Sequence, residues 1–396
     1  MKKISMLGLV AGLAIMATSC SKDGESASQE FPEGKIPVTF SMKTSGLMVN
    51  AMTKAPSTNY TADGFRIFAF KQSDDQWLFL DEVELRNPVY TDNGDGSGGV
   101  LTGIAAMDEG VYRFIPTYGL DATGAGFTIG EFAADQAWDD ANPVLISHTA
   151  GAVPEFFTLE SNFAGISDYT VSVGGNNPDY TATINRAVAR VDVLIVRATG
   201  NQQEYTEVAK EASVFGNKTL VSATMAFTGV NSSMNYFGAL PTTASTFDLT
   251  YTIGADGDAA VSDDVLIGNS VTPIYGTAGY QGYNAVAAAD VLQGAAQMYG
   301  PFLIPNADET PVQSAVLTFT DNEGTDRIIT LNDASIPLER NYVTIIKIYL
   351  LENGDGTDPE DIWSENVSFA VTLDTEYAGY HDVTGGTIGG QPATQP

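Results

Sequence analysis

The sequence predicts an all-β chain that folds as tandem β-sandwich domains. Short runs of alternating apolar and polar residues recur along the chain, and turn-forming Gly, Asn and Asp separate them. Gly is frequent, with 40 residues in 396, and convincing helical stretches are few. Hydrophobic residues make up 43% of the chain, which is enough for a buried core. The roughly 360 residues that follow the N-terminal region are enough for two such domains.

Residues 1–19 are typical of a secretion signal. Two lysines are followed by an apolar stretch over residues 4–16 that is too short to cross a bilayer, and small residues precede Cys20. The arrangement resembles a bacterial lipoprotein signal, which implies cleavage before Cys20 and acylation, including palmitate, of that residue. More than one acyl chain gives stable anchoring. An ordinary secreted protein with an incidental cysteine stays the alternative. Residues 20–35 form a polar tether.

Residues 36–54 are expected to form the first strand and a protease-sensitive segment after it. The side chains on the buried face of this strand alternate with polar ones and are Ile36, Val38, Phe40 and Met42. Pro37 cannot donate a ladder hydrogen bond, so the strand should begin there or lie at a sheet edge. Lys54 lies in a polar stretch and is the first candidate for cleavage by a trypsin-like protease, with Lys43 second. Loss of the strand would leave a groove that needs a replacement.

Further strand-like runs extend to the end of the chain. They complete an N-terminal domain over residues 36–183 and a C-terminal domain over residues 184–383, with a clear hairpin at 315–331 and a flexible tail at 384–396. Residues 131–140 are the best candidate for a short helix in the first half, with a loop as the alternative. The last strand of the second domain alternates in the same way as the first strand, through Val367, Phe369, Val371 and Leu373.

Charge and motif content exclude several classes of function. The formal net charge of −31 repels nucleic acid and anionic lipid. One cysteine gives no disulfide framework and no thiolate metal site, and His148 and His381 lie far apart, outside any metal-binding spacing. We therefore expect no enzyme, no cofactor and no metal. The acidic Gly-rich turns at 92–99, 256–258 and 353–356 indicate plain turns more than calcium sites, because the first lacks the carboxylate that a calcium loop needs at its twelfth position.

Several motifs, in their order and spacing, resemble those of the fimbrillin-like pilins of Bacteroidetes. They lie at residues 53–55 before 63–70, at 184–191, at 302–306 and at 338–345. The resemblance implies two tandem transthyretin-like β-sandwich domains, a lipoprotein precursor, and a trypsin-like protease that removes the first strand. Relatives are cut after Arg, whereas Arg66 lies here in a predicted strand that the core needs. Cleavage after Lys54 is therefore the expectation.

The resemblance also implies polymerisation by donor-strand exchange. A strand from the C-terminal region 367–383 of one copy would fill the groove of the next, through Val367, Phe369, Val371 and Leu373. Such a head-to-tail contact builds an open filament. The implied partners are copies of the chain, other fimbrial subunits, the maturation protease and, through lipid on Cys20 before cleavage, the outer membrane. The implied location is the cell surface, in a fimbrium that supports adhesion.

Two alternatives stay open. A surface glycan-binding lipoprotein would also be acidic and lipidated, and Trp77, Trp138 and Trp363 could stack on sugar rings. Trp77 lies in a strand pattern, however, which favours core packing. A fimbrial tip or anchor subunit would keep its first strand or lack the donor end. Arg186 and Arg190, which are unusual in so acidic a chain, are expected to pair with nearby carboxylates.

Overall fold

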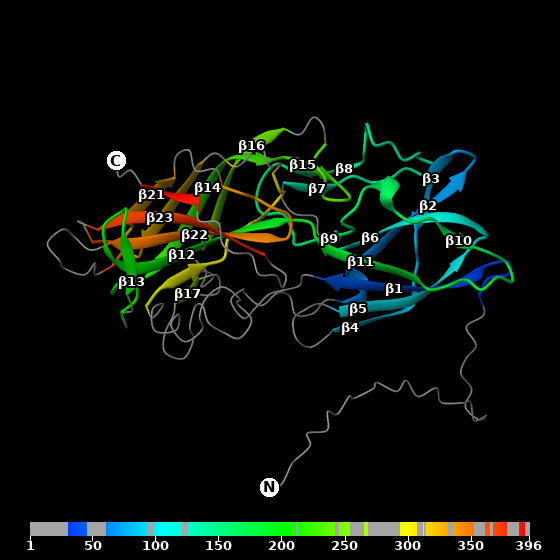
Figure 1. Cartoon of the computed structure of the whole chain (residues 1–396), viewed down its shortest axis with the longest axis horizontal. Coiled ribbons are helices and arrows are strands. Elements are labelled where there is room, and N and C mark those ends of the chain that lie inside the picture. The colour runs from blue at the N-terminus through cyan, green and yellow to red at the C-terminus, as the bar shows by residue number, and fades with distance from the viewer. Residues whose placement is uncertain are drawn as a thin grey trace, which may run out of the picture.

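The computed structural model is built almost entirely of β-strands, which fall into two halves (Figure 1). The residues that it describes are 31–45, 61–92, 99–120, 126–208, 210, 212–241, 245–253, 265–267, 294–306, 312, 314–331, 336–351, 361–364, 367–377 and 388–392. Over these residues the only helical elements are two 3-10 turns, η1 (Ala62–Gly64) and η2 (Phe163–Gly165). The prediction of an all-β sandwich fold is confirmed. Among the same residues no helix has the length and apolar character needed to cross a membrane.

The N-terminal half is organised on a nine-stranded sheet with the order β3-β2-β6-β9-β11-β1-β5-β4, and β10 pairs with β6. Its strands are β1 (Ile36–Ser45), β2 (Phe65–Ser73), β3 (Gln76–Glu82), β4 (Arg86–Asp92), β5 (Gly99–Met107), β6 (Gly110–Tyr118), β9 (Phe157–Thr158), β10 (Tyr169–Val171) and β11 (Tyr180–Arg186). The β1–β11 pair is parallel, and the other pairs of this sheet are antiparallel. The first strand of the chain therefore lies in the interior of the sheet.

Two hydrophobic cores lie on opposite faces of β2 and β6. One core joins side chains of β1, β5 and β11 to Ile67 and Phe114. The other joins Phe68 and Ile115 to a small sheet of β7 (Phe127–Ile129), β8 (Leu145–His148) and β15 (Ser233–Asn235). Because β2 and β6 are covered on both faces, loss of either core would expose them.

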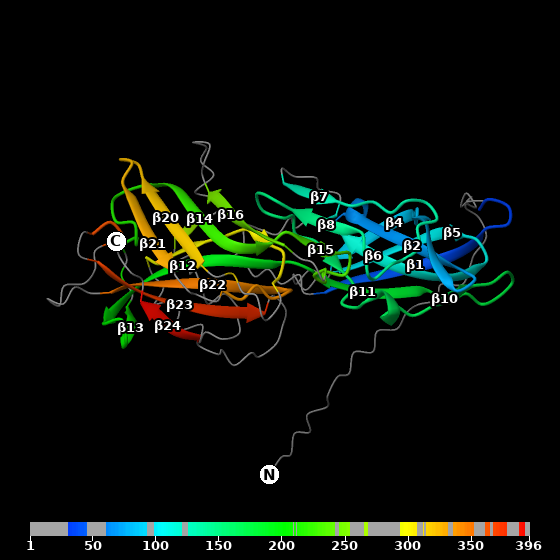
Figure 2. The ribbon, with the colours of Figure 1, turned by 90° about the horizontal axis from the view of Figure 1, so that it is seen from above.

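The C-terminal half is a two-layer sandwich, seen edge-on in Figure 2. One layer has the order β17-β18-β12-β22-β23-β24, and β13 and β19 also pair with β12; the other has the order β16-β14-β20-β21. Their bounds are β12 (Ala189–Gly200), β13 (Tyr205–Val208), β14 (Leu220–Asn231), β16 (Thr246–Ile253), β17 (Val265–Ile267), β18 (Ala296–Met298), β19 (Phe302–Leu303), β20 (Ser314–Asp321), β21 (Asp326–Leu331), β22 (Tyr342–Leu351), β23 (Ser368–Tyr377) and β24 (Ile388–Pro392). The predicted hairpin at 315–331 is the β20–β21 pair.

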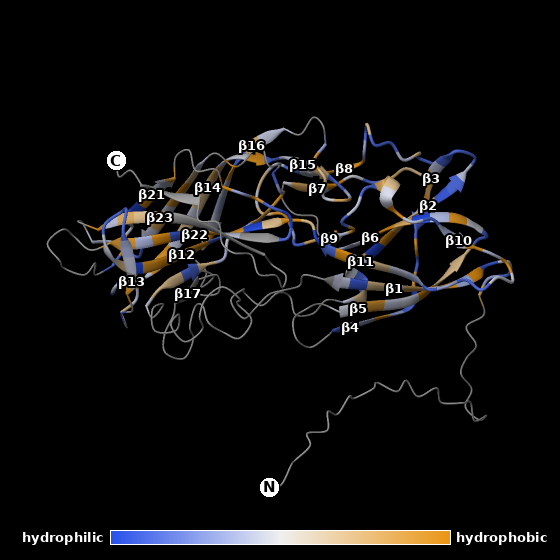
Figure 3. Ribbon diagram, viewed as in Figure 1, coloured by the Kyte–Doolittle hydropathy of each residue, from blue (hydrophilic) through white to orange (hydrophobic). Residues whose placement is uncertain are grey.

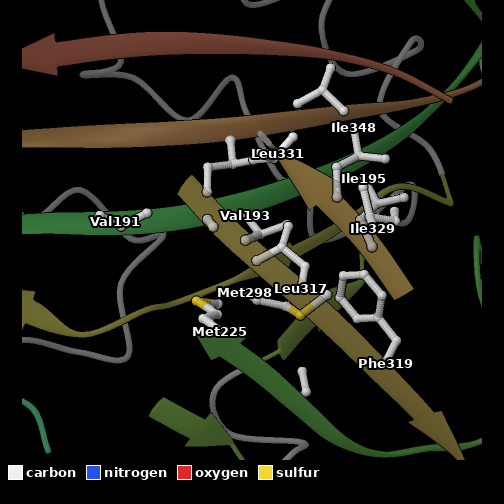
Figure 4. Close-up of a cluster of buried hydrophobic side chains, with 14 of the residues drawn as sticks. Val191, Val193, Ile195, Met225, Met298, Leu317, Phe319, Ile329, Leu331 and Ile348 are labelled. Atoms are coloured by element: carbon white, nitrogen blue, oxygen red, sulfur yellow. The ribbon is translucent and has the colours of Figure 1, made fainter. Parts of the chain in front are cut away.

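Alternation along the strands fills the space between these two layers. Val191, Val193 and Ile195 of β12 meet side chains of β14, β20 and β21 in one cluster (Figure 4). The same alternation appears along the ribbons as a change between orange and blue (Figure 3). The period-2 pattern in the sequence is therefore what places these side chains in the core.

The two halves interlock at their junction. The predicted boundary between residues 183 and 184 falls inside β11, because that strand continues to pair with β1 and β9 through Asn185 and Arg186. The chain enters the second half between β11 and β12. It then returns, since β15 follows β14 in the sequence but pairs with β8 of the N-terminal half. Tyr236 and Phe237 bury their rings in the N-terminal core that covers β2 and β6.

Residues 131–140 do not form the helix considered for them, and the alternative of a loop is confirmed. The backbone of this segment binds the edge of β3: Phe79 N–H donates to the Gln136 carbonyl over 2.8 Å, and Asp135 N–H donates to the Phe79 carbonyl over 3.0 Å. A strand edge offers unpaired backbone groups, and this segment satisfies them from a turn, in which Gln136 N–H donates to the Ala133 carbonyl over 3.0 Å and Asp135 has a φ of 57°. The non-local hydrogen bonds therefore outweigh the local preference for helix.

Candidate functional site: the first strand and its groove

Strand β1 presents one fully buried face. The exposed fractions of its inward side chains are 9% for Ile36, 1% for Val38, and 0% for both Phe40 and Met42. Pro37 and Lys43 on the other face are exposed. The predicted alternation is confirmed, and the side chains predicted to leave with the strand are those that fill the core.

The hydrogen-bond ladders of β1 are unequal on its two sides. Pairing with β5 runs the whole strand, from Ile36 opposite Met107 to Thr44 opposite Gly99. Pairing with β11 begins only at Phe40. No residue of β11 therefore lies opposite Pro37, and an interior strand can begin with a proline. The second half of β1 is held on both sides and the first half on one.

An aromatic pocket surrounds the centre of the strand. The ring centroid of Phe40 lies 5.0 Å from that of Phe114 and 5.3 Å from that of Tyr180, in edge-on and tilted arrangements. The rings of Phe114 and Tyr180 lie 4.8 Å apart and are themselves buried. Burial raises the pKa of the Tyr180 hydroxyl, which donates to the Phe114 carbonyl over 3.4 Å. This pocket is thus apolar and fixed by the sheet on two sides.

Polar contacts hold both ends of β1. At its start Lys35 Nζ lies 2.8 Å from Asp108 Oδ2, and the hydrogen bond from Lys35 lowers the pKa of that carboxyl. At its end Gly99 N–H donates to the buried Thr44 Oγ1 over 3.0 Å, and the Thr44 and Tyr90 hydroxyls lie 3.1 Å apart. Burial raises the pKa of Tyr90. The end nearer to the predicted cleavage site is the more deeply held one.

The candidate cleavage residues differ in accessibility. Cys20 and Lys54 lie outside the described residues. Lys43 is inside β1, where it is paired with Val100 and Thr183 on either side. A protease binds exposed and unpaired chain, so this fold protects Lys43. Arg66 is likewise part of β2, and its guanidinium donates to Glu82.

The predicted donor strand is built into its own sandwich. Strand β23 lies between β22 and β24, and Val367, Phe369 and Val371 are buried in the C-terminal core. Leu373 pairs in register with Ile346. The structure does not bring β1 and β23 of one chain together. Residues 388–392, expected to be part of a flexible tail, form the edge strand β24 instead, because they find a partner in β23.

The tryptophans of the glycan-binding alternative are packing residues. The Trp138 ring stacks on Phe163 at 4.4 Å, and the Arg113 guanidinium lies 4.4 Å over Trp77. Trp363 Nε1 donates to the Phe215 carbonyl over 3.1 Å. Each of the three is partly buried against a core, which favours a packing role over stacking on a sugar.

The histidines and acidic turns considered in the sequence show no metal site where the structure describes them. His148 is buried, its Nε2 lies 2.6 Å from the Gly151 carbonyl, and burial lowers its pKa. His381 lies outside the described residues, as do positions 93–98, 256–258 and 353–356 of the acidic turns. Among the residues that the structure describes, no cluster of three or more His, Cys, Asp or Glu could hold a metal.

Three arginines near the junction of the two halves bind carboxylates or backbone carbonyls. As expected, Arg186 and Arg190 pair with carboxylates, at 2.5 Å from Glu155 and 2.6 Å from Asp192. Sequence reasoning missed Arg340, whose guanidinium donates to five backbone carbonyls, those of Thr158, Leu159, Asn185, Arg186 and Phe237. Burial lowers the pKa of Arg340. Arg340 stands in the motif at 338–345, just before a strand, in a chain with few basic residues, and that position was the one available signal.

Comparison with known proteins gives only distant likenesses to solved structures. No family model and no curated protein matches the chain. A candidate adhesin of Bacteroides ovatus aligns with 11% identity and a TM-score of 0.39, over 89% of this chain and 96% of that one. A candidate cell adhesion protein of Bacteroides eggerthii aligns with 12% identity and a TM-score of 0.34, over 85% and 95%. Likenesses at these scores establish no common function.

Proposed function

We propose that this chain is a structural subunit of a cell-surface fimbrium that supports adhesion, and that it polymerises by donor-strand exchange after proteolytic removal of its first strand. The observation that supports this proposal most is that β1 is an interior strand with a fully buried face. It is joined to β2 through residues 46–64, and this connection contains Lys54. One cut there would turn an interior strand into a separable peptide.

The energetics of β1 support exchange more than simple release. Burial of four apolar side chains at about 1.5–3 kcal/mol each gives roughly 6–12 kcal/mol of gross stabilisation. Two ladders add to this. A cleaved strand should therefore stay in place until another strand replaces it. A strand from a second copy would restore both ladders and the core, and repetition builds an open head-to-tail filament.

In this proposal the precursor is a lipoprotein of the outer membrane. Acylated Cys20 anchors it, and cleavage at Lys54 releases the anchor together with β1. The partners are copies of the chain, other fimbrial subunits and the trypsin-like protease. The role is structural, without catalysis or a cofactor.

One observation favours a second candidate, a fimbrial tip or anchor subunit. The strand with the right alternation for a donor, β23, is occupied in its own core. A subunit that keeps this strand could accept a neighbour without donating to another. The packed tryptophans give the glycan-binding alternative less support.

The decisive test is the intact mass and N-terminal sequence of the protein sheared from its native cells, with a gel run at graded denaturation. A mature end at Ala55 and multimers that resist SDS are the expected result. A Lys54→Gln variant is the control and should accumulate as uncleaved monomer. An acylated Cys20 on a protein found only as monomer would overturn the stalk assignment.

A further inference from the structure

The centre of the β1 groove differs in chemistry from its ends. Ile36, Val38 and Met42 contribute aliphatic side chains to the core, whereas the Phe40 ring lies among other rings. Phe114, which forms one wall, also lies 5.9 Å from the ring of Tyr169 and 5.7 Å from that of Tyr112. When β1 leaves, the space of one aromatic ring opens in the middle of the groove.

This pocket cannot close easily around a smaller side chain. Its walls are rings on the paired strands β6 and β11, and these strands are fixed in the sheet through β2 and β9. A small residue would leave a cavity, which costs stability because the surrounding structure relaxes only partly. An aromatic ring regains the edge-on contacts that Phe40 makes. The pocket therefore discriminates among incoming strands.

We infer that this pocket selects an aromatic side chain in the strand that refills the groove, and that Phe369 of a second copy fills it. The inference rests on the proposed function, and it adds the register of the incoming strand, that is, which of its residues lies in the aromatic pocket. Among the four residues predicted to face inward in the candidate donor, Val367, Phe369, Val371 and Leu373, Phe369 is the one aromatic, with Val367 and Val371 on either side. Phe40 has Val38 and Met42 in the corresponding places. Phe369 therefore meets the pocket whichever way the strand runs.

The place of β23 in its own sheet is compatible with this use. It is second from the edge, and its outer neighbour β24 pairs with it at three positions. The detachment of β23 and β24 breaks one further ladder, with β22. The outward residues Ser368, Ala370 and Thr372 next to Phe369 carry no charge, and the two carboxylates of β23, Asp374 and Glu376, come only towards its C-terminal end.

The test uses the full chain after a cut in the segment 46–60, with the β1 peptide removed in mild denaturant. Fluorescently labelled peptides of residues 34–45 and 365–376 are titrated and their binding is measured by anisotropy. Phe40→Ala and Phe369→Ala should each weaken binding of their peptide about a hundredfold or more. Phe369→Leu, which keeps bulk but not the ring, and the matched control Val371→Ala should each cost about tenfold.

The outcomes separate the pocket from the proposed function. If Phe40→Ala weakens its peptide no more than Val38→Ala does, the pocket does not select a ring and the inference is wrong. If the 34–45 peptide needs its ring but Phe369→Ala binds as tightly as the native 365–376 peptide, another residue fills the pocket. If the 365–376 peptide does not bind while the 34–45 peptide does, the partner strand is misassigned. If neither native peptide binds, strand exchange itself fails.

Discussion

The first strands of the two halves occupy the same place in their sheets and are held in different ways. Strand β1 runs parallel to β11 and antiparallel to β5, and strand β12 runs parallel to β22 and antiparallel to β18 and β19. Residues 189–198 of β12 are buried on both faces. In β1 the residues that alternate with the inward set are half-buried or exposed, including Pro37 and Lys43.

Charge adds to this difference. β12 carries the buried Asp192, whose carboxylate accepts from Arg190 over 2.6 Å and from Gly300 N–H over 3.2 Å. Removal of β12 would leave buried polar groups without partners, and no generic strand could replace them. The inward face of β1 is apolar except for Thr44 at its end. An apolar alternating strand can substitute for β1 but not for β12, so the chain has one replaceable first strand and one permanent one.

The largest expected effect that tests this comparison is that of Phe40→Ala. In the uncut chain it should lower the free energy of unfolding by about 3–5 kcal/mol, because a buried ring is lost and its pocket stays open. Urea unfolding followed by tryptophan fluorescence measures it. Thr39→Ala, in the same strand but on the outer face, is the control. Equal losses for the two variants would show that β1 does not hold the core through its inward face.

Asp192→Asn should have the next largest effect. It removes a buried charge from β12 while keeping the size of the side chain, and we expect a loss of about 2–3 kcal/mol from weakened charged hydrogen bonds. The matched control is Asp248→Asn, at an exposed position of β16. The same urea titration measures both. A loss below that of the control would mean that charge does not fix β12.

Thr44→Val should have a smaller effect, of about 1 kcal/mol, because it deletes the hydroxyl that binds Gly99 N–H and contacts Tyr90. The change should also speed the loss of the cleaved β1 peptide, since this end is paired on both sides. The rate can be followed by mass spectrometry with an excess of labelled 34–45 peptide. An unchanged rate would indicate that the strand leaves from its Ile36 end first.

The smallest effect concerns pH at the start of β1. The hydrogen bond from Lys35 lowers the pKa of Asp108 below its ordinary value, so the stabilisation is present above that value and is lost as the pH falls through the lowered pKa. The protection of the Ile36 and Val38 amides from hydrogen exchange, measured relative to the intrinsic exchange rate, should therefore fall as the pH drops below the ordinary carboxyl value of about 4. Asp108→Asn should remove this pH dependence. If it persists in the variant, another group causes it.

The C-terminal half also contains a carboxyl with a lowered pKa, that of the buried Asp321. Burial of Asp321 opposes its ionisation, but hydrogen bonds from Lys218 and from the backbone N–H groups of Thr325 and Glu323 outweigh this and lower its pKa to about 2. Its contribution is complete above the ordinary pKa and is lost as the pH falls towards about 2. We therefore expect the β20–β21 hairpin to stay ordered at acid pH where the start of β1 has loosened.

Local pattern was enough to predict the strands that carry the proposal. The alternation from Ile36 to Met42 and the turn between β20 and β21 are properties of neighbouring residues, so they can be read directly. That β1 lies in the interior of its sheet could not be read, because its neighbours β5 and β11 lie far along the chain. Pro37 was also compatible with an edge strand. Whether a strand lacks a partner on one side depends on the tertiary structure and cannot be read from the strand itself.

The parts that sequence reasoning missed depend on contacts between distant segments. The return of β15 to the N-terminal half and the turn conformation of residues 131–140 both arise from backbone groups that pair with remote strands. Arg340 belongs to the same class. Its partners are backbone carbonyls, which every residue has, so no sequence pattern marks them.

The position of Arg340 has a mechanical consequence. Its guanidinium binds the carbonyls of Asn185 and Arg186 at the end of β11, and it lies two residues before β22 begins at Tyr342. In a filament of the proposed kind, tension enters through the strand held by β5 and β11 and leaves through the strand detached from β22. Arg340 connects these two places within a few residues. We expect the pulling force to pass along this short route, loading ladders in shear while the hydrophobic cores carry little of it.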